Sequence, residues 1–145
     1  MTQLEDLFCR KSADVDKVVH SLQGVKNPLT TKSLKKILDA HGRLVRIIQP
    51  VLRKGTTPRS FVSKYLHFHN SAVPIFDSVA VGVLKKLYRR DNRSGPFEIP
   101  ATADKKYGDF LQRFWRLYSE VQKTGVTVSV KLLDNYLLAF EKDTK

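Results

Sequence analysis

The chain has 145 residues, of which 41% are hydrophobic and 28% charged, and this composition is typical of a globular domain rather than a disordered segment. Its single cysteine excludes an internal disulfide, and no apolar run approaches the ~20 residues that cross a bilayer. The net charge of +12 is unevenly distributed, because residues 17–97 hold 16 Lys and Arg but only three Asp, which gives +13, whereas the rest of the chain carries −1. We expect one cytoplasmic, monomeric domain spanning 1–145 that does not enter a membrane.

Apolar residues recur at helical spacing along most of the chain, which predicts an all-α fold of about six helices. Residues 1–22 predict a helix that is broken near Ser12. From Thr31 a regular apolar stripe, with Lys and Arg outside it, predicts an amphipathic helix that bends near Pro50 and ends at 55–58.

A shorter helix is expected at about 59–69. Its expected buried residues are Phe61, Tyr65, Leu66 and Phe68. Three further helices are predicted after a turn at 70–74, and they begin near residues 78, 104 and 128. The longest predicted loop is 91–103. Together these elements form a single compact helical domain.

The concentration of positive charge in the middle of the chain favours a polyanionic partner, because self-repulsion on this scale destabilises a compact fold. We expect this partner to be nucleic acid, with DNA favoured over RNA. An anionic membrane, an acidic protein or solubility alone remain alternatives. The cations expected to contact phosphates are Arg53, Lys54, Lys85, Lys86, Arg89, Arg90 and Arg93.

Several kinds of site are not indicated by the sequence. It has no Gly-rich phosphate loop, and four histidines with one cysteine are too few and too scattered for a structural zinc site. His67 and His69 lie two residues apart, so a helix directs them to different sides. We therefore expect no metal and no small-molecule cofactor.

Residues 59–78 stand out because a short basic helix leads through a proline turn to a single acid, Asp77. Asp77 is the only acidic residue between Asp39 and Asp91. One interpretation is structural, since Asp and Ser commonly cap the helix that follows them. The other is that an isolated carboxylate in a basic field serves chemistry.

The second interpretation gains weight from a resemblance. Within 52–88, two groups of residues resemble the helix-hairpin-helix DNA glycosylases, especially the small bacterial proteins similar to 8-oxoguanine DNA glycosylase. These groups are Ser63, Lys64, Leu66, His67 and Phe68, followed by Pro74, Ile75, Asp77 and Ser78. The resemblance places the DNA-binding hairpin at Gly55, Thr56, Thr57 and Arg59, and the catalytic carboxylate at Asp77. Thr57 departs from the family's second glycine, and Arg59 stands where lyase-active members have lysine.

The resemblance implies a DNA-repair hydrolase that cleaves an N-glycosidic bond. Asp77 would stabilise the positive charge that develops on the sugar, and base release without strand cleavage is expected unless Lys64 acts as the amine. Trp115, Phe76 or Tyr118 would stack on the extruded base, although packing alone also explains these aromatics. The alternative function is a non-catalytic, basic, helical nucleic-acid-binding protein.

Overall fold

The computed structural model describes residues 2–88 and 97–143, with side chains for 2–88 and 97–140. Within these ranges seven α-helices and one 3-10 turn occur and no strand does, which confirms the all-α class. The predicted break in the first helix falls at Lys11 and divides it into two, so the count exceeds six by one. The elements are α1 (Gln3–Arg10), α2 (Ser12–His20), α3 (Thr31–Ile48), η1 (Gln49–Val51), α4 (Arg59–His69), α5 (Ser78–Leu87), α6 (Lys105–Lys123) and α7 (Val130–Asp143).

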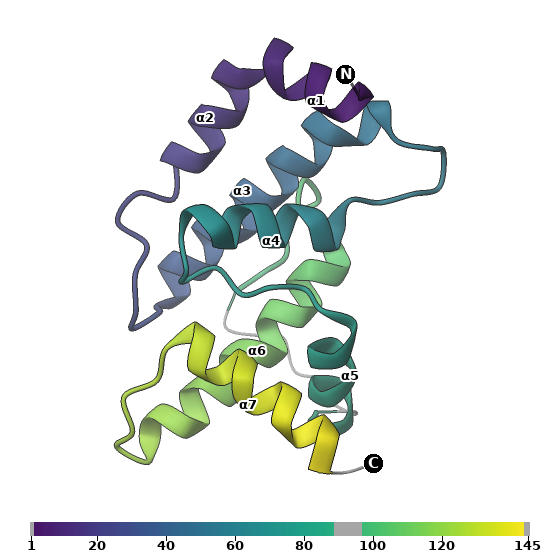
Figure 1. The fold of residues 1–145 in the computed structure, drawn as a ribbon. Coiled ribbons are helices and arrows are strands. Elements are labelled where there is room, and N and C mark those ends of the chain that lie inside the picture. The colour runs from purple at the N-terminus through teal and green to yellow at the C-terminus, as the bar shows by residue number, and fades with distance from the viewer. Residues whose placement is uncertain (1, 89–96, 144–145) are drawn as a thin grey trace.

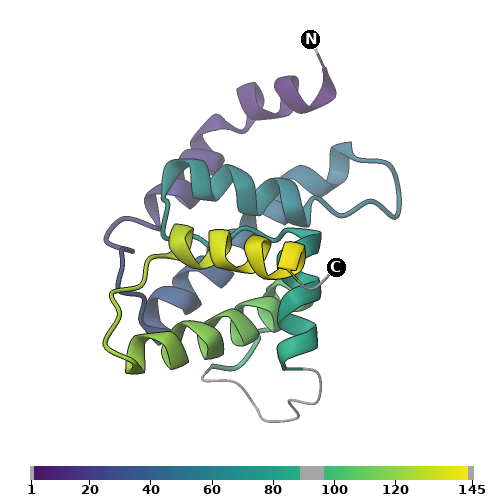
Figure 2. The same ribbon diagram turned by 60° about the horizontal axis from the view of Figure 1, so that its bottom comes forward.

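The helices are arranged along the molecule in an order close to that of the sequence. α3 and α4 lie between the N-terminal pair, α1 and α2, and the C-terminal group formed by α5, α6 and α7 (Figures 1 and 2). α2 and α4 both pack on α3, and α5 packs most extensively on α7. The connection between η1 and α4, residues 52–58, projects from the body of the molecule in both views.

Short polar side chains start most of these helices. The hydroxyl of Thr30 accepts a hydrogen bond from the backbone N–H of Ser33 at 3.1 Å, and Asp104 Oδ1 accepts one from Tyr107 N–H at 2.8 Å. These bonds satisfy backbone donors that a helix cannot satisfy internally. By contrast, α4 begins after Pro58, and no side chain caps it.

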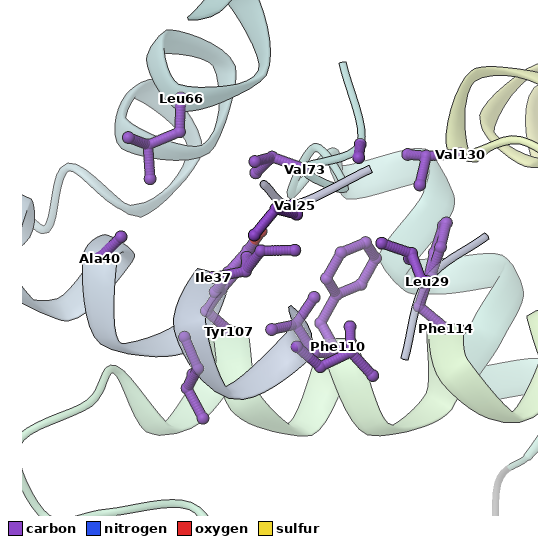
Figure 3. Close-up of a cluster of buried hydrophobic side chains, with 14 of the residues drawn as sticks. Val25, Leu29, Ile37, Ala40, Leu66, Val73, Tyr107, Phe110, Phe114 and Val130 are labelled. Carbon is purple, nitrogen blue, oxygen red and sulfur yellow. The ribbon is translucent and has the colours of Figure 1, made fainter. Parts of the chain in front are cut away.

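The hydrophobic core runs along α3 and α6. Figure 3 shows Ile37 of α3 and Phe110 and Phe114 of α6 beside side chains from the loops, such as Val25, with Leu66 of α4 pointing toward α3 at one side. All five side chains are buried. The core therefore joins the helices of both halves of the chain into one continuous cluster.

The expected buried face of α4 is wrong at two positions. Phe61 is 42% exposed and Phe68 is 85% exposed, whereas Val62, Ser63 and Leu66 are the buried residues of this helix. The reason is that Val62 and Leu66 pack into the core on one side of α4, where the Ser63 hydroxyl also accepts from the N–H of Phe76. With this side inward, the aromatic side of the helix faces outward.

A buried polar network joins α3, α4 and α6. Arg59 Nε donates to Asp104 Oδ1 at 2.6 Å, and the Arg59 carbonyl accepts from His41 Nε2 at 3.0 Å. His41 stacks on the ring of Tyr107 at 3.8 Å between centroids, and the Tyr107 hydroxyl donates to the Pro74 carbonyl at 2.6 Å. The network thus fixes the start of α4 and the start of α6 against the middle of α3.

The pKa values in this network follow from its burial. Desolvation lowers the pKa of His41 to about 4, so the ring is neutral near pH 7. Desolvation by itself would raise the pKa of Asp104, but hydrogen bonds from Arg59 and from the N–H of Tyr107 outweigh it and lower that pKa. Asp104 is therefore an ionised partner for the Arg59 guanidinium.

Gly42 marks the closest approach between α3 and the segment before α6. A Cβ added there would lie 2.8 Å from the carbonyl oxygen of Thr102 and 3.1 Å from Cα of Ala103. Both are backbone atoms, which cannot move away as a flexible side chain can. Gly82 in α5 offers the opposite case, since nothing lies within 4 Å of an added Cβ.

We expect Gly42→Ala to destabilise the protein by about 1–3 kcal/mol, because overpacking against backbone outweighs the gain in helix propensity. Gly82→Ala should stabilise it by about 0.5–1 kcal/mol, since only the propensity changes. Urea denaturation followed by circular dichroism measures both. Equal effects of the two substitutions would contradict the close approach at Gly42.

Candidate nucleic-acid interface

Asp77 lies at the N-cap of α5. Its Oδ1 accepts hydrogen bonds from the backbone N–H groups of Val79 at 2.8 Å and Ala80 at 3.4 Å. Both bonds use the same oxygen, so the cap does not need Oδ2. The structure thus shows the capping role of the half-buried Asp77, and its catalytic role stays a prediction.

The residues that carry the glycosylase resemblance hold α4 to the segment before α5. Ser63 binds the N–H of Phe76, and His67 Nδ1 is 2.8 Å from the Val73 carbonyl. Leu66 is completely buried, and the Pro74 carbonyl accepts from Tyr107. The shared pattern therefore has a structural explanation in this chain, namely the packing of one helix on the connection that follows it.

A second carboxyl group lies close to Asp77. Asp134 of α7 has a buried Oδ1 with no hydrogen-bond partner in the part of the chain that the structure describes. Burial, together with the negative charge of Asp77, raises the pKa of Asp134 to about 7. The packing of α7 on α5 therefore brings together two acids, of which Asp134 is partly protonated near neutral pH.

The predicted hairpin residues form an exposed turn, except for Arg59. Thr56 N–H donates to the Arg53 carbonyl at 2.9 Å, and Gly55 between them has φ +89°, a conformation that favours glycine. Arg53, Lys54, Thr56 and Thr57 are exposed. Arg59 instead is paired with Asp104, with 20% of its side chain exposed, and its guanidinium lies 5.5 Å from the centre of the Phe76 ring.

The two predicted groups of phosphate-binding cations are far apart. Lys85 and Lys86 belong to the last turn of α5, at the opposite end of the molecule from the 52–58 connection that carries Arg53 and Lys54 (Figures 1 and 2). The other predicted cations, Arg89, Arg90 and Arg93, lie outside the described residues. The described cations therefore do not form one patch.

The predicted base-stacking residues differ in exposure. Tyr118 is completely buried, and its hydroxyl accepts from the N–H of Leu29 at 2.9 Å, so neither face of its ring is open to a base. Trp115 is half-buried and stacks on Tyr118 with centroids 5.7 Å apart. Phe76 is also half-buried, between the Arg59 guanidinium and Phe110. The structure does not bring these three aromatics together around one opening.

An open groove between α2 and α3 gathers cations from both helices. It has a volume of about 430 Å³ and is bordered by four cations, Lys11, Lys17, Arg43 and Arg46, and by one acid, Asp14. Lys11, Lys17 and Arg46 are exposed. Arg43 forms a weak surface pair with Asp39 at 3.7 Å, and the Arg46 guanidinium donates to the Thr102 carbonyl.

The groove continues past Pro50 into a second hollow of about 590 Å³ between α1 and η1. Arg10 and Arg53 border this hollow, and Asp6 neutralises Arg10 through an ion pair at 2.9 Å. We refer to the two hollows together as the basic groove. Its rim holds six cations and two acids, Asp6 and Asp14.

Sequence reasoning placed Arg43, Arg46 and Arg53 on the basic outer face of the helix from Thr31, but it missed Lys11 and Lys17. The sequence pattern that could have identified these two lysines is local and weak. Lys11, Asp14 and Lys17 recur every three residues and border the groove together with buried Val18. What joins them to α3 is tertiary packing, which periodicity does not reveal.

Comparison with protein-family models, with curated proteins and with solved structures finds no match to this chain. In the described ranges, no group of three or more His, Cys, Asp or Glu is placed to hold a metal ion. None of the described helices combines the length and apolar character needed to cross a membrane.

The proximity of Asp77 and Asp134 predicts a pH-dependent stability. The Asp134 pKa of about 7 lies above the value of about 3.9 for an unfolded chain. Protonated Asp134 therefore contributes fully to stability below pH 3.9, and this contribution is lost as the pH rises through 7. The Asp134→Asn variant does not undergo this loss. Its free energy of unfolding relative to wild type should therefore increase by about 2 kcal/mol between pH 5 and pH 8.

Urea denaturation at the two pH values measures this difference. Comparing one variant between two pH values cancels any change in packing that the amide introduces. Asp14→Asn, at an exposed position of α2, is the matched control and should show no such growth. A pH-independent difference for Asp134→Asn would show that Asp134 is ionised throughout.

Proposed function

We propose that this protein binds nucleic acid through the sugar-phosphate backbone, which lies along the basic groove between α2, α3 and η1. The observation that carries the proposal is the convergence of Lys11, Lys17, Arg43 and Arg46 on one open depression, which Asp14 also borders and where Asp39 pairs weakly with Arg43. The groove consists of two hollows that share Pro50 on their rims, which suits an extended polyanion rather than a small anion.

The physical basis is counterion release. Lys and Arg that neutralise phosphates release the cations condensed on the nucleic acid, so affinity falls steeply as salt rises. Such contacts position the backbone and read no sequence. The exposed side chains of the groove can adjust to a backbone of either kind, and DNA is the partner we propose.

The double variant Lys17→Gln with Arg43→Gln should weaken binding and reduce the slope of log affinity against log salt by about 0.9 for each lost contact with duplex DNA. Both positions are chosen because neither belongs to the core. Fluorescence anisotropy with a labelled duplex at several salt concentrations gives the slope.

The matched control is Lys123→Gln with Lys131→Gln, which removes the same charge from exposed positions of α6 and α7. It should leave the slope nearly unchanged. Asp14→Asn should raise the affinity, because it removes an acid from the groove. If the control weakens binding as much as the groove variant, the cations act only through net charge and the groove is not the site.

A second candidate function is the N-glycosidic cleavage that the helix-hairpin-helix resemblance implies. The observation that favours it is the position of Asp77, a half-buried carboxylate whose Oδ2 is not needed for the cap, at the start of the helix after α4. A carboxylate in this setting could stabilise positive charge on a sugar. Lys64, the alternative amine, is exposed on α4.

Asp77→Asn separates the two roles of this residue, since asparagine also caps helices but carries no charge. If the protein is a glycosylase, the variant keeps its fold and its DNA binding but loses base release from duplexes that contain 8-oxoguanine, uracil or an alkylated purine. Alkali-revealed strand cleavage measures release, and melting temperature reports the fold. Absence of release by the wild type on every lesion would leave the binding function alone.

A further inference from the structure

The outward face of α4 is an aromatic surface rather than a charged one. Phe61, Lys64, Tyr65 and Phe68 follow the spacing i, i+3, i+4, i+7, which places them on one side of the helix, opposite buried Val62 and Leu66. We call these four residues the aromatic stripe. Phe68 is 85% exposed and Phe61 is 42% exposed, although phenylalanine is usually buried.

Neighbouring aromatic rings extend the stripe at both ends. Phe8 of α1 lies 6.4 Å from Phe61 and 5.3 Å from Tyr65 between ring centroids. At the other end, exposed His69 lies 4.8 Å from Tyr65 and 5.4 Å from Phe68. The contacts between these side chains hold the rings in place but leave much of the surface of Phe68 open to solvent.

We propose that the aromatic stripe stacks the bases of single-stranded nucleic acid whose backbone is held by the basic groove; this inference rests on the nucleic-acid function proposed above. Stacking on aromatic side chains is how proteins bind unpaired bases without reading their sequence. A duplex keeps its bases stacked inside, so its bases cannot reach such a surface. From Phe61 to Phe68 the helix rises about 10 Å, which matches about three stacked nucleotides at 3.4 Å each.

The charges around the stripe favour a polyanion over a second copy of this chain. Lys64 lies within the stripe, and α4 contains no Asp or Glu. A second copy of this chain also has a net charge of +12, so the two copies would repel each other. Burial raises the pKa of the Tyr65 hydroxyl, and the negative charge of nearby Asp16 raises it further. Because Asp16 would repel phosphates, we place them on the Lys64 side of the stripe.

The stripe is connected to the basic groove through α1. Arg10 borders the groove from one side of this helix, while Phe8 contacts Phe61 and Tyr65 from the other. A single strand that follows the groove can therefore reach α4 by passing over one helix. This continuity is the geometric reason to assign both surfaces to one ligand.

The test compares two single strands of equal length, an oligothymidine and a strand of abasic sugar-phosphate units. Wild type should bind the oligothymidine more tightly, and Phe68→Ser should lower that affinity roughly 5- to 50-fold while leaving the abasic strand unchanged. Phe68→Trp should retain the preference for bases. The matched control is Tyr136→Ser, because Tyr136 is a 52% exposed aromatic on α7, and it should change neither affinity.

The groove variant Lys17→Gln with Arg43→Gln distinguishes the two proposals, because it should weaken both strands alike. If that variant weakens binding but Phe68→Ser does not, the stacking inference fails and the groove stands. If wild type binds the labelled duplex but neither single strand, the stacking inference fails and the groove stands, whereas failure to bind all three would overturn both proposals. A dimer in sedimentation that Phe68→Ser dissociates, with base preference intact, would show that the stripe joins two copies and would overturn the inference.

Discussion

The ion pair between Arg59 and Asp104 is the interaction on which the arrangement of the helices depends. It takes two charges largely out of water, since only 20% of the Arg59 side chain and 8% of the Asp104 side chain are exposed. Here the Arg59 carbonyl accepts from His41, and Asp104 also caps α6 through Tyr107 N–H. One side chain therefore sets the start of α4, and its partner sets the start of α6.

This constraint explains why a protein with so much positive charge keeps a defined surface. The network neutralises one arginine internally, and the opposite face of α3 is left to present Arg43 and Arg46 to the groove. Gly42, beside His41 in the same helix, allows the backbone before α6 to approach closely. The same backbone segment accepts a hydrogen bond from the Arg46 guanidinium through the Thr102 carbonyl, so this packing also holds one cation of the groove.

The predictability of this structure from sequence differs between local and tertiary features. The apolar stripe after Thr31 was regular enough to identify α3, but its predicted end at 55–58 was wrong, because the helix ends at Ile48 and a 3-10 turn that contains Pro50 follows it. The orientation of α4 was not predictable, because apolar or aromatic residues occur on both of its sides. The inward side is the one where Val62 and Leu66 are buried, and buried Ser63 binds the N–H of Phe76, a residue 13 positions away.

The candidate site likewise combines features that local sequence predicts with features that depend on tertiary packing. The position of Asp77 predicted a helix cap, which the structure confirms, whereas its neighbour Asp134 lies on a helix that no local pattern connects to it. Predicting the basic groove required knowing that α2 packs on α3, and predicting the aromatic stripe required knowing the orientation of α4. In each case the missing information was which helix faces which.

The separation of Arg59 and Asp104 in the chain has a consequence for synthesis. The two residues are 45 positions apart, and Tyr107, which covers His41, follows shortly after Asp104. At about 5–20 residues per second, a ribosome takes roughly 2–9 s to make this stretch. During that interval the growing chain holds Arg59 and His41 without Asp104 and Tyr107, the residues that pair and cover them in the folded protein. The polar network around His41 and Arg59 can therefore form only after the first turn of α6 has left the ribosome.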